Sequence, residues 1–148
     1  MNLLAVAGTK RIWFGRIVRP FKFTCPVQGE HALLLVVGDD SVTPEEQSRL
    51  SEQFVRSGCR YAMCFGPTGS SWDDSIDMVG VTDEADGHAS PFVMTTWHDH
   101  EPIGDTIGFF AEHAHFDDWS TDDYLVLVLG GTDANERIVR DAVRSRFR

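Results

Sequence analysis

The chain has 148 residues, with 23 Asp and Glu against 13 Lys and Arg, and a net charge of −10 at neutral pH. A chain of this length is expected to form one domain that buries roughly 70% of its unfolded surface, so it needs no disulfide or metal to fold. The negative charge argues against direct nucleic-acid binding, because phosphate backbones attract surfaces rich in Lys and Arg. It suits a basic protein partner or divalent cations instead.

The charges are unevenly placed along the sequence. No Lys or Arg occurs between Arg60 and Arg137, while residues 61–136 hold sixteen Asp and Glu and five of the six histidines. Three interpretations are open: a negative surface for a basic partner, basic termini that fold onto the acidic middle of the same or a second copy, or solubility alone. A homo-oligomer is therefore left open.

Cysteine content and the N-terminus bear on the compartment. Cys25, Cys59 and Cys64 are an odd number without a disulfide-framework spacing, which favours a reducing environment. The N-terminal apolar run is too short for a signal peptide, and no stretch approaches the ~20 apolar residues of a membrane span. We therefore expect a cytoplasmic protein without membrane association.

The first thirty residues differ from the rest. Residues 12–23 mix aromatic and basic side chains around turn formers, which predicts a basic N-terminal extension or edge hairpin over residues 1–30. Residues 31–148 are expected to form an α/β domain, because strand and helix patterns alternate four times from His31 onward. The predicted strands, apolar on both faces, cover residues 31–38, 61–65, 92–97 and 124–129.

Helix signals follow each predicted strand. A capping box at Thr43–Glu46 opens a helix that Gly58 can end, and a second box is expected at Ser71–Asp74. Further helices are expected from Pro102 and after Gly130-Gly131-Thr132, with residues 82–90 as a polar loop. We expect the second helix to turn its aspartates away from its apolar face, Gly104 and Gly108 to allow close packing, and Ile138 to face inward.

This alternation predicts a single-domain α/β fold. Fully buried strands with intervening helices indicate a three-layer sandwich of the Rossmann-like or flavodoxin-like kind: a mainly parallel sheet of about four to five strands with helices on both faces. The carboxyl ends of the strands would then lie along one edge, where open α/β sheets bind their ligands.

Nearly all side chains able to do chemistry fall in loops at this predicted edge. The candidate ligand or metal residues are Asp39, Asp40, Asp73, His98, Asp99 and His100. Carboxylates suit Mg²⁺ or Mn²⁺, and a histidine shifts the preference toward Mn²⁺, Fe²⁺ or Zn²⁺. The alternative is that the carboxylates only stabilise helix N-termini. Apart from this candidate divalent metal, we expect no cofactor.

No motif in the chain names an activity by itself. The turn from Gly66 to Ser71 lacks a Walker lysine, and no Gly-x-Gly-x-x-Gly follows a strand. Gly69-Ser-Ser-Trp does not match a nucleophile elbow. Asp39-Asp40 resembles the acidic pair of response-regulator receiver domains, but the third strand ends in Trp97-His98 and no Lys follows Lys22, so we reject phosphoaspartate chemistry.

Thr95-Thr-Trp-His-Asp-His-Glu101, together with Phe65-Gly66, Trp72-Asp73-Asp74 and the strand from Tyr124, resembles a small bacterial domain family of unknown function. The resemblance covers about residues 31–130 and implies a compact α/β domain without an assigned activity.

The leading hypothesis is a non-catalytic acidic partner-binding protein, for example an immunity or accessory protein of a bacterial conflict or defence system. Its partner would be a basic protein, and Trp72, Asp74 and Glu101 are the candidate contacts. The alternative is a metal-dependent hydrolase or phosphoryl-transfer enzyme that uses the carboxylate and histidine candidates at the strand edge, with His98 moving a proton.

Overall fold

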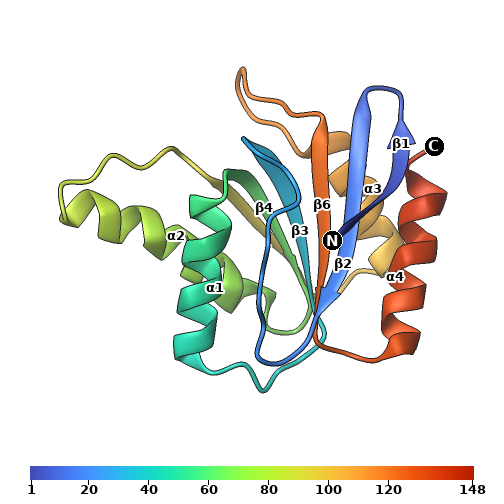
Figure 1. The fold of residues 1–148 in the computed structure, drawn as a ribbon, viewed down its shortest axis with the longest axis horizontal. Helices are drawn as coiled ribbons and strands as arrows, with labels where there is room; N and C mark the ends of the chain where they lie inside the picture. Colours follow the sequence, from blue (N-terminus) through green and yellow to red (C-terminus); the bar gives the residue numbers. More distant parts are fainter.

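Six strands form one sheet in the order β1-β2-β6-β3-β4-β5 in the computed structural model, which describes residues 1–148 (Figure 1). The strands are β1 (Asn2–Ala7), β2 (Lys10–Ile17), β3 (His31–Val37), β4 (Cys59–Phe65), β5 (Met94–His98) and β6 (Asp123–Leu129). The helices are α1 (Pro44–Arg56), α2 (Gly69–Ala85), α3 (Ile103–His113) and α4 (Asp133–Arg146). The predicted α/β class is confirmed.

The sheet is parallel except at one edge. β2, β6, β3, β4 and β5 run in the same direction, and only β1 is antiparallel to its neighbour β2. The sheet has six strands rather than the predicted four to five, because the N-terminal residues form two strands. β2 pairs with β6 from Arg11↔Asp123 to Ile17↔Leu129, so the hairpin extends the same sheet.

Side chains of the central strands alternate between two hydrophobic clusters, one on each face. Leu34 and Val126 belong to the cluster under α3 and α4, whereas Leu33 and Leu125 belong to the cluster under α1 and α2. Figure 1 shows the two helix pairs on opposite sides of the sheet. This two-sided burial explains why β3 and β6 are apolar at consecutive positions.

The first helix begins as predicted and the second does not. Thr43 and Glu46 form the reciprocal hydrogen bonds of a capping box, and Pro44 occupies the first turn of α1. The capping box predicted at Ser71 is wrong, because α2 already begins at Gly69, with Thr68 as N-cap and no side-chain cap. α2 also continues to Ala85, into the predicted polar loop.

Two further expectations about the helices have different outcomes. The prediction for Ile138 is wrong: it is 58% exposed, because Val139, Val143 and Phe147 supply the inward face of α4 and its end. The close packing predicted at Gly104 and Gly108 is present only toward the end of one side chain of α4. The guanidinium of Arg146 lies 3.4 and 3.3 Å from where their Cβ atoms would be.

β5 is an edge strand rather than a strand buried on both faces. It pairs only with β4, begins two residues later than predicted, and leaves Trp97 55% exposed. No helix in the structure combines the length and the apolar character needed to cross a bilayer. All three cysteines are free thiols.

The backbone at Gly58, just after α1, leaves no room for a side chain. Its φ is +111°, and an added Cβ would meet the backbone carbonyl of Gly29 well inside contact distance. Gly58→Ala is therefore expected to lower the free energy of unfolding by about 2 kcal/mol or more.

Gly80→Ala is the matched control, because Gly80 lies in α2 with no atom within 4 Å of the added methyl group. This substitution is expected to raise the free energy of unfolding by about 0.5–1 kcal/mol through helix propensity. Urea denaturation measures both variants, and effects of the same sign would contradict the structure.

Candidate functional site

The carboxyl ends of β3 and β6 are the point where the chain turns in opposite directions, and such a point holds the ligand in many open α/β sheets. The two loops instead lie in contact. A Cβ on Gly38 would be 3.0 Å from the Cα of Gly131, and the Gly38 N–H donates to the carbonyl of Leu129 at 2.8 Å. The backbone of these loops therefore fills the space that holds a ligand in many open α/β sheets.

Asp39 and Asp40 lie beside this contact. The Asp39 carboxylate accepts hydrogen bonds from the Ser41 hydroxyl at 2.6 Å and the Ser41 N–H at 2.8 Å. These bonds lower the pKa of Asp39, the hydroxyl having the larger effect. Asp40 is exposed. Asp39 thus stabilises its own turn, whereas the helix N-terminus that follows is capped by Thr43.

Asp73 is buried, contrary to the expectation that α2 turns it away from the core. It is 5% exposed, and its Oδ2 has no hydrogen-bond partner. Burial raises the pKa of Asp73, and the neighbouring carboxylate of Asp77 adds to the shift. Thr95 of β5 donates to Asp77 at 2.8 Å, which shows that this side of α2 packs on β5. Asp73 lies one turn earlier on the same side of the helix and is therefore buried with it.

His98 belongs to a short chain of polar side chains at the end of β5. Its Nδ1 pairs with the carboxylate of Glu101, and its Nε2 lies 3.3 Å from the Thr96 hydroxyl. The ring packs on Phe109 of α3, with centroids 5.3 Å apart. The order hydroxyl, imidazole, carboxylate matches a hydrolase triad, but Thr96 does not line either of the clefts beside α2. We therefore infer that Thr96 and Glu101 hold the His98 ring in one orientation.

The candidate metal ligands lie in three separate places. Asp39 and Asp40 follow β3, Asp73 lies within α2, and the others follow Trp97 of β5. Asp99 pairs with His100 at 3.5 Å, and the His100 side chain is 93% exposed. No group of three or more His, Cys, Asp or Glu side chains is arranged to hold a metal ion.

The three candidate partner contacts also separate. Trp72 is 2% exposed and packs against Phe54, with ring centroids 6.5 Å apart, so it belongs to the core rather than to a binding surface. Asp74 is exposed and lines a cleft between α1 and α2. Glu101 follows β5 and is paired with His98.

The cleft between α1 and α2 has a volume of about 620 Å³. Four carboxylates line it, together with serine and threonine hydroxyls and two apolar residues: Glu52, Asp74, Asp83, Asp86, Ser48, Ser71, Ser75, Thr82, Met78 and Val79. Hydrogen bonds from Gln47 to Ser71 at 3.1 Å and between Ser51 and Ser75 at 2.8 Å link the two helices. Arg56 and His88 also line the cleft, so its carboxylates outnumber its basic groups, and it is rich in hydrogen-bond acceptors.

Arg56 and Asp83 form the strongest contact across this cleft, and the sequence patterns did not single them out. Two hydrogen bonds of 2.6 Å join the guanidinium to the carboxylate. The hydrogen bond from Arg56 lowers the pKa of Asp83 to about 2. Beyond Ile76, Asp83 is the only buried residue of α2, so this pair holds the helix end that extends away from the sheet (Figure 1).

A second cleft of about 690 Å³ lies on the other side of α2, between the helix and residues 88–93. It is more apolar, with Val81, Phe92 and Val93 in its lining, and it includes the carboxylates of Asp77 and Glu84. Phe92 is 63% exposed. Both sides of α2 therefore present carboxylates beside a concave surface.

These features define an α/β protein with one mainly parallel sheet and an acidic surface around α2. Its sequence matches the family described as a domain of unknown function, DUF7684, over residues 19–145, so the chain belongs to that family. The resemblance expected over about residues 31–130 is confirmed, and the match extends further at both ends. A comparison with curated proteins finds no match.

The Arg56–Asp83 pair predicts a specific dependence on pH. A carboxyl with a lowered native pKa contributes stability above its unfolded pKa of about 3.9 and loses it as pH falls through about 2. Arg56→Met is therefore expected to be less stable than the wild type at pH 7, with the difference shrinking between about pH 4 and pH 2. Carbon-detected NMR of the Asp83 carboxyl should show its pKa rise in the variant; an unchanged value would contradict the pairing.

The buried carboxyl of Asp73 predicts a dependence of stability on pH of the opposite sign. A native pKa above the unfolded value means that the folded protein binds the proton more tightly, so stability increases as pH falls through the native pKa. Asp73→Asn is expected to raise the urea midpoint at pH 7, and this gain should disappear toward about pH 4. Asp74→Asn, the same change at the exposed neighbour, is the control and should shift the midpoint little at either pH.

Proposed function

We propose that this is a non-catalytic binding protein of the bacterial cytoplasm that presents an acidic surface to a basic protein partner. An immunity or accessory protein of a conflict system is one class with this character. The observation that carries the proposal is the distribution of charge in the fold, in which Asp83 is the only carboxylate of α2 that pairs with an arginine. The support has three parts: charge pairing elsewhere, the unpaired acids themselves, and the shape of the cleft.

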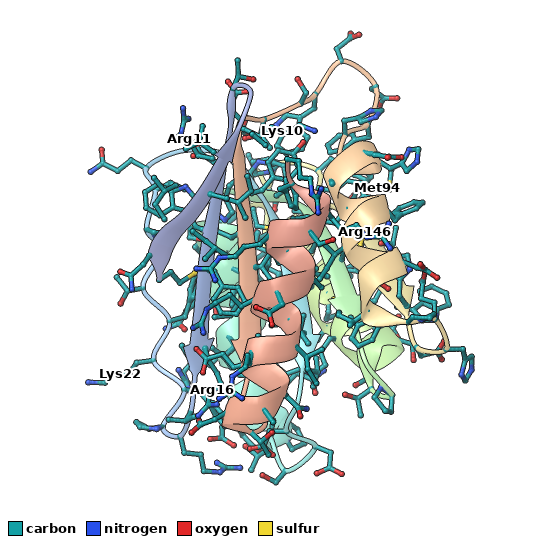
Figure 2. All side chains as sticks on the ribbon, turned by 90° about the vertical axis from the view of Figure 1, so that its right-hand side faces the viewer. Lys10, Arg11, Arg16, Lys22, Met94 and Arg146 are labelled. Carbon is teal, nitrogen blue, oxygen red and sulfur yellow. The ribbon has the colours of Figure 1, made fainter.

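The basic termini pair with acids of the middle segment on one side of the molecule. Arg11 contacts Asp123 at 2.8 Å, Arg16 contacts Asp133 at 2.8 Å, and Arg146 lies 3.6 Å from Asp105. Figure 2 shows Arg11 and Arg16 along the hairpin and Arg146 between α4 and α3. Much of the positive charge is therefore used within the molecule, on the side of the hairpin and α4.

On the opposite side, only one carboxylate is compensated in this way. Residues 69–102, which include α2 and β5, contain eight carboxylates and no Lys or Arg: Asp73, Asp74, Asp77, Asp83, Glu84, Asp86, Asp99 and Glu101. Asp83 alone among them pairs with an arginine. Carboxylates gathered without counter-charges create a negative potential that attracts a positive surface and speeds association.

The cleft between α1 and α2 offers a shape for cationic side chains. Its carboxylates and hydroxyls accept hydrogen bonds, and only two apolar residues line it. Small-molecule sites are mostly apolar and enclosed. Carboxylates instead bind guanidinium groups through paired hydrogen bonds and ammonium groups as point charges. A basic protein surface with protruding Arg or Lys side chains fits this lining better than a small organic ligand.

The alternative, a metal-dependent hydrolase or phosphoryl-transfer enzyme, has no comparable support. Its candidate ligands fall in three places, and the imidazole of His98 is already paired with Glu101. Metal catalysis needs several ligands around one point and an open coordination position. We therefore put forward the binding function alone.

We also propose that the fold is a variant of the doubly wound Rossmann-like sandwich. The order β5-β4-β3-β6 corresponds to the 3-2-1-4 order of the first part of that fold, with strands numbered along the chain from β3. β2, from the N-terminal hairpin, occupies the next position. The three layers follow from the helix pairs on the two faces.

The test is capture of a partner from a lysate of the native host with the immobilised protein. A basic protein is expected to bind at about 50 mM salt and to be released at about 500 mM, because exposed charges are screened over a few Å at high ionic strength. The double substitution Asp74→Asn with Asp86→Asn removes two charges from the cleft and is expected to reduce capture at least about fivefold.

Asp117→Asn with Asp118→Asn is the matched control. These two aspartates lie between α3 and β6, outside both clefts, and their replacement changes the net charge by the same amount. Equal loss of capture in both double variants would show attraction to net charge rather than to the cleft. Absence of any salt-sensitive basic partner would overturn the proposal.

A further inference from the structure

β5 leaves one side of its backbone without a partner. It is the last strand of the sheet and pairs only with β4. The His98 carbonyl accepts a hydrogen bond from the Gly66 N–H at 3.0 Å, so His98 directs its backbone groups toward β4. Because alternate residues of a strand point to opposite sides, the N–H and C=O groups of Thr95 and Trp97 face the open edge.

This edge lacks most of the features by which proteins prevent strand pairing. The sequence of β5, Met-Thr-Thr-Trp-His, contains no Lys, no Pro and no acidic residue, and its pairing with β4 has no bulge. The other edge strand, β1, carries a bulge between Leu3 and Ala5. The open side of β5 is thus the more regular template for a further strand.

The side chains next to the open edge are acidic and aromatic on both faces of the sheet. On the α2 face, Asp77 binds Thr95, and Trp97 is 55% exposed. On the α3 face, Glu101 pairs with His98, and Phe109 is 38% exposed. Met94 lies on this second face, where its side chain packs against the cluster under α3 (Figure 2).

We propose that the open edge of β5 binds an extended segment of a basic partner by strand addition, with Lys or Arg alternating with apolar or threonine side chains. The backbone groups of Thr95 and Trp97 supply the pairing. Asp77 and Glu101 attract the cations, and Trp97 offers its ring face to one of them. This inference rests on the proposed function, since it names the form in which the basic partner is recognised.

The charges beside β5 favour a basic segment over a second copy of the protein as the strand that pairs with this edge. Pairing of β5 with β5 of another molecule would bring the carboxylates of Asp77, Asp99 and Glu101 near those of the second copy, with no Lys or Arg in residues 61–136 of either chain to offset them. Like charges facing each other across paired strands are destabilising. A segment that carries positive charge removes this penalty and gains attraction instead.

The probe is a fluorescent ten-residue peptide in which lysine alternates with threonine or valine. Fluorescence anisotropy with the full chain is expected to show binding at about 50 mM salt that weakens strongly at about 500 mM. A peptide of the same side chains with every second amide N-methylated cannot pair along one edge. Its affinity is expected to fall at least about tenfold, because two or more backbone hydrogen bonds are lost.

A pair of variants separates the backbone from the side chain of Thr95. Thr95→Pro removes the N–H on the open edge, while Thr95→Val removes only the hydroxyl that binds Asp77 and keeps the N–H. Binding should fall at least about tenfold in the first variant and change much less in the second. Amide hydrogen exchange of the unmodified protein adds a direct reading: the peptide should protect Thr95 and Trp97, whose N–H groups are otherwise free.

Three outcomes would overturn the inference. Equal binding of the N-methylated peptide would show that the acidic surface attracts cations without strand pairing, which leaves the proposed function standing. Protection of Thr95 and Trp97 that rises with protein concentration alone would assign the edge to a second copy. Absence of binding by either peptide would reject the strand site, whereas the proposed function would still be decided by capture from the lysate.

Discussion

The pairing of β3 with β6 is the constraint on which the rest of the structure depends. These strands pair from Ala32↔Tyr124 to Val37↔Leu129 and are buried almost throughout, so both faces of the sheet need covering helices. The chain leaves their carboxyl ends in opposite directions, and the glycines of the two loops pack directly on each other. The usual ligand position is thereby filled, and the exposed chemistry of the protein lies beside α2 and β5 instead.

The same acidic segment has two different roles in the fold. Asp105 and Asp123 lie where arginines from the ends of the chain reach them, and they help to join the termini to the body of the protein. Asp77 and Asp99 lie on the far side, and neither of them pairs with an arginine or lysine. The acidic middle of the sequence thus contributes paired carboxylates to one side of the molecule and mostly unpaired ones to the other. The two sides are far apart because the sheet separates the hairpin from β5 by its full width (Figure 1).

What could be predicted from the sequence was local. The capping box at Thr43 and the double-sided strands follow from hydrogen bonds and periodicities within a few residues, and the structure has both. The burial of Asp73 could not be predicted, because it depends on how closely α2 packs on β5. The exposure of Trp97 depends on strand order, which no local pattern specifies. The same holds for Arg56 and Asp83, which lie 27 positions apart.

The contact between Arg56 and Asp83 has a consequence for any cation that enters the cleft between α1 and α2. A guanidinium from another molecule that approaches Asp83 competes with one already bound by two short hydrogen bonds. Its affinity would be the difference between two similar ion pairs, and displacing Arg56 would free the end of α2, where no other residue beyond Ile76 is buried. Binding of an external cation to Asp83 and packing of the end of α2 against α1 are thermodynamically linked, so each weakens the other by the same factor.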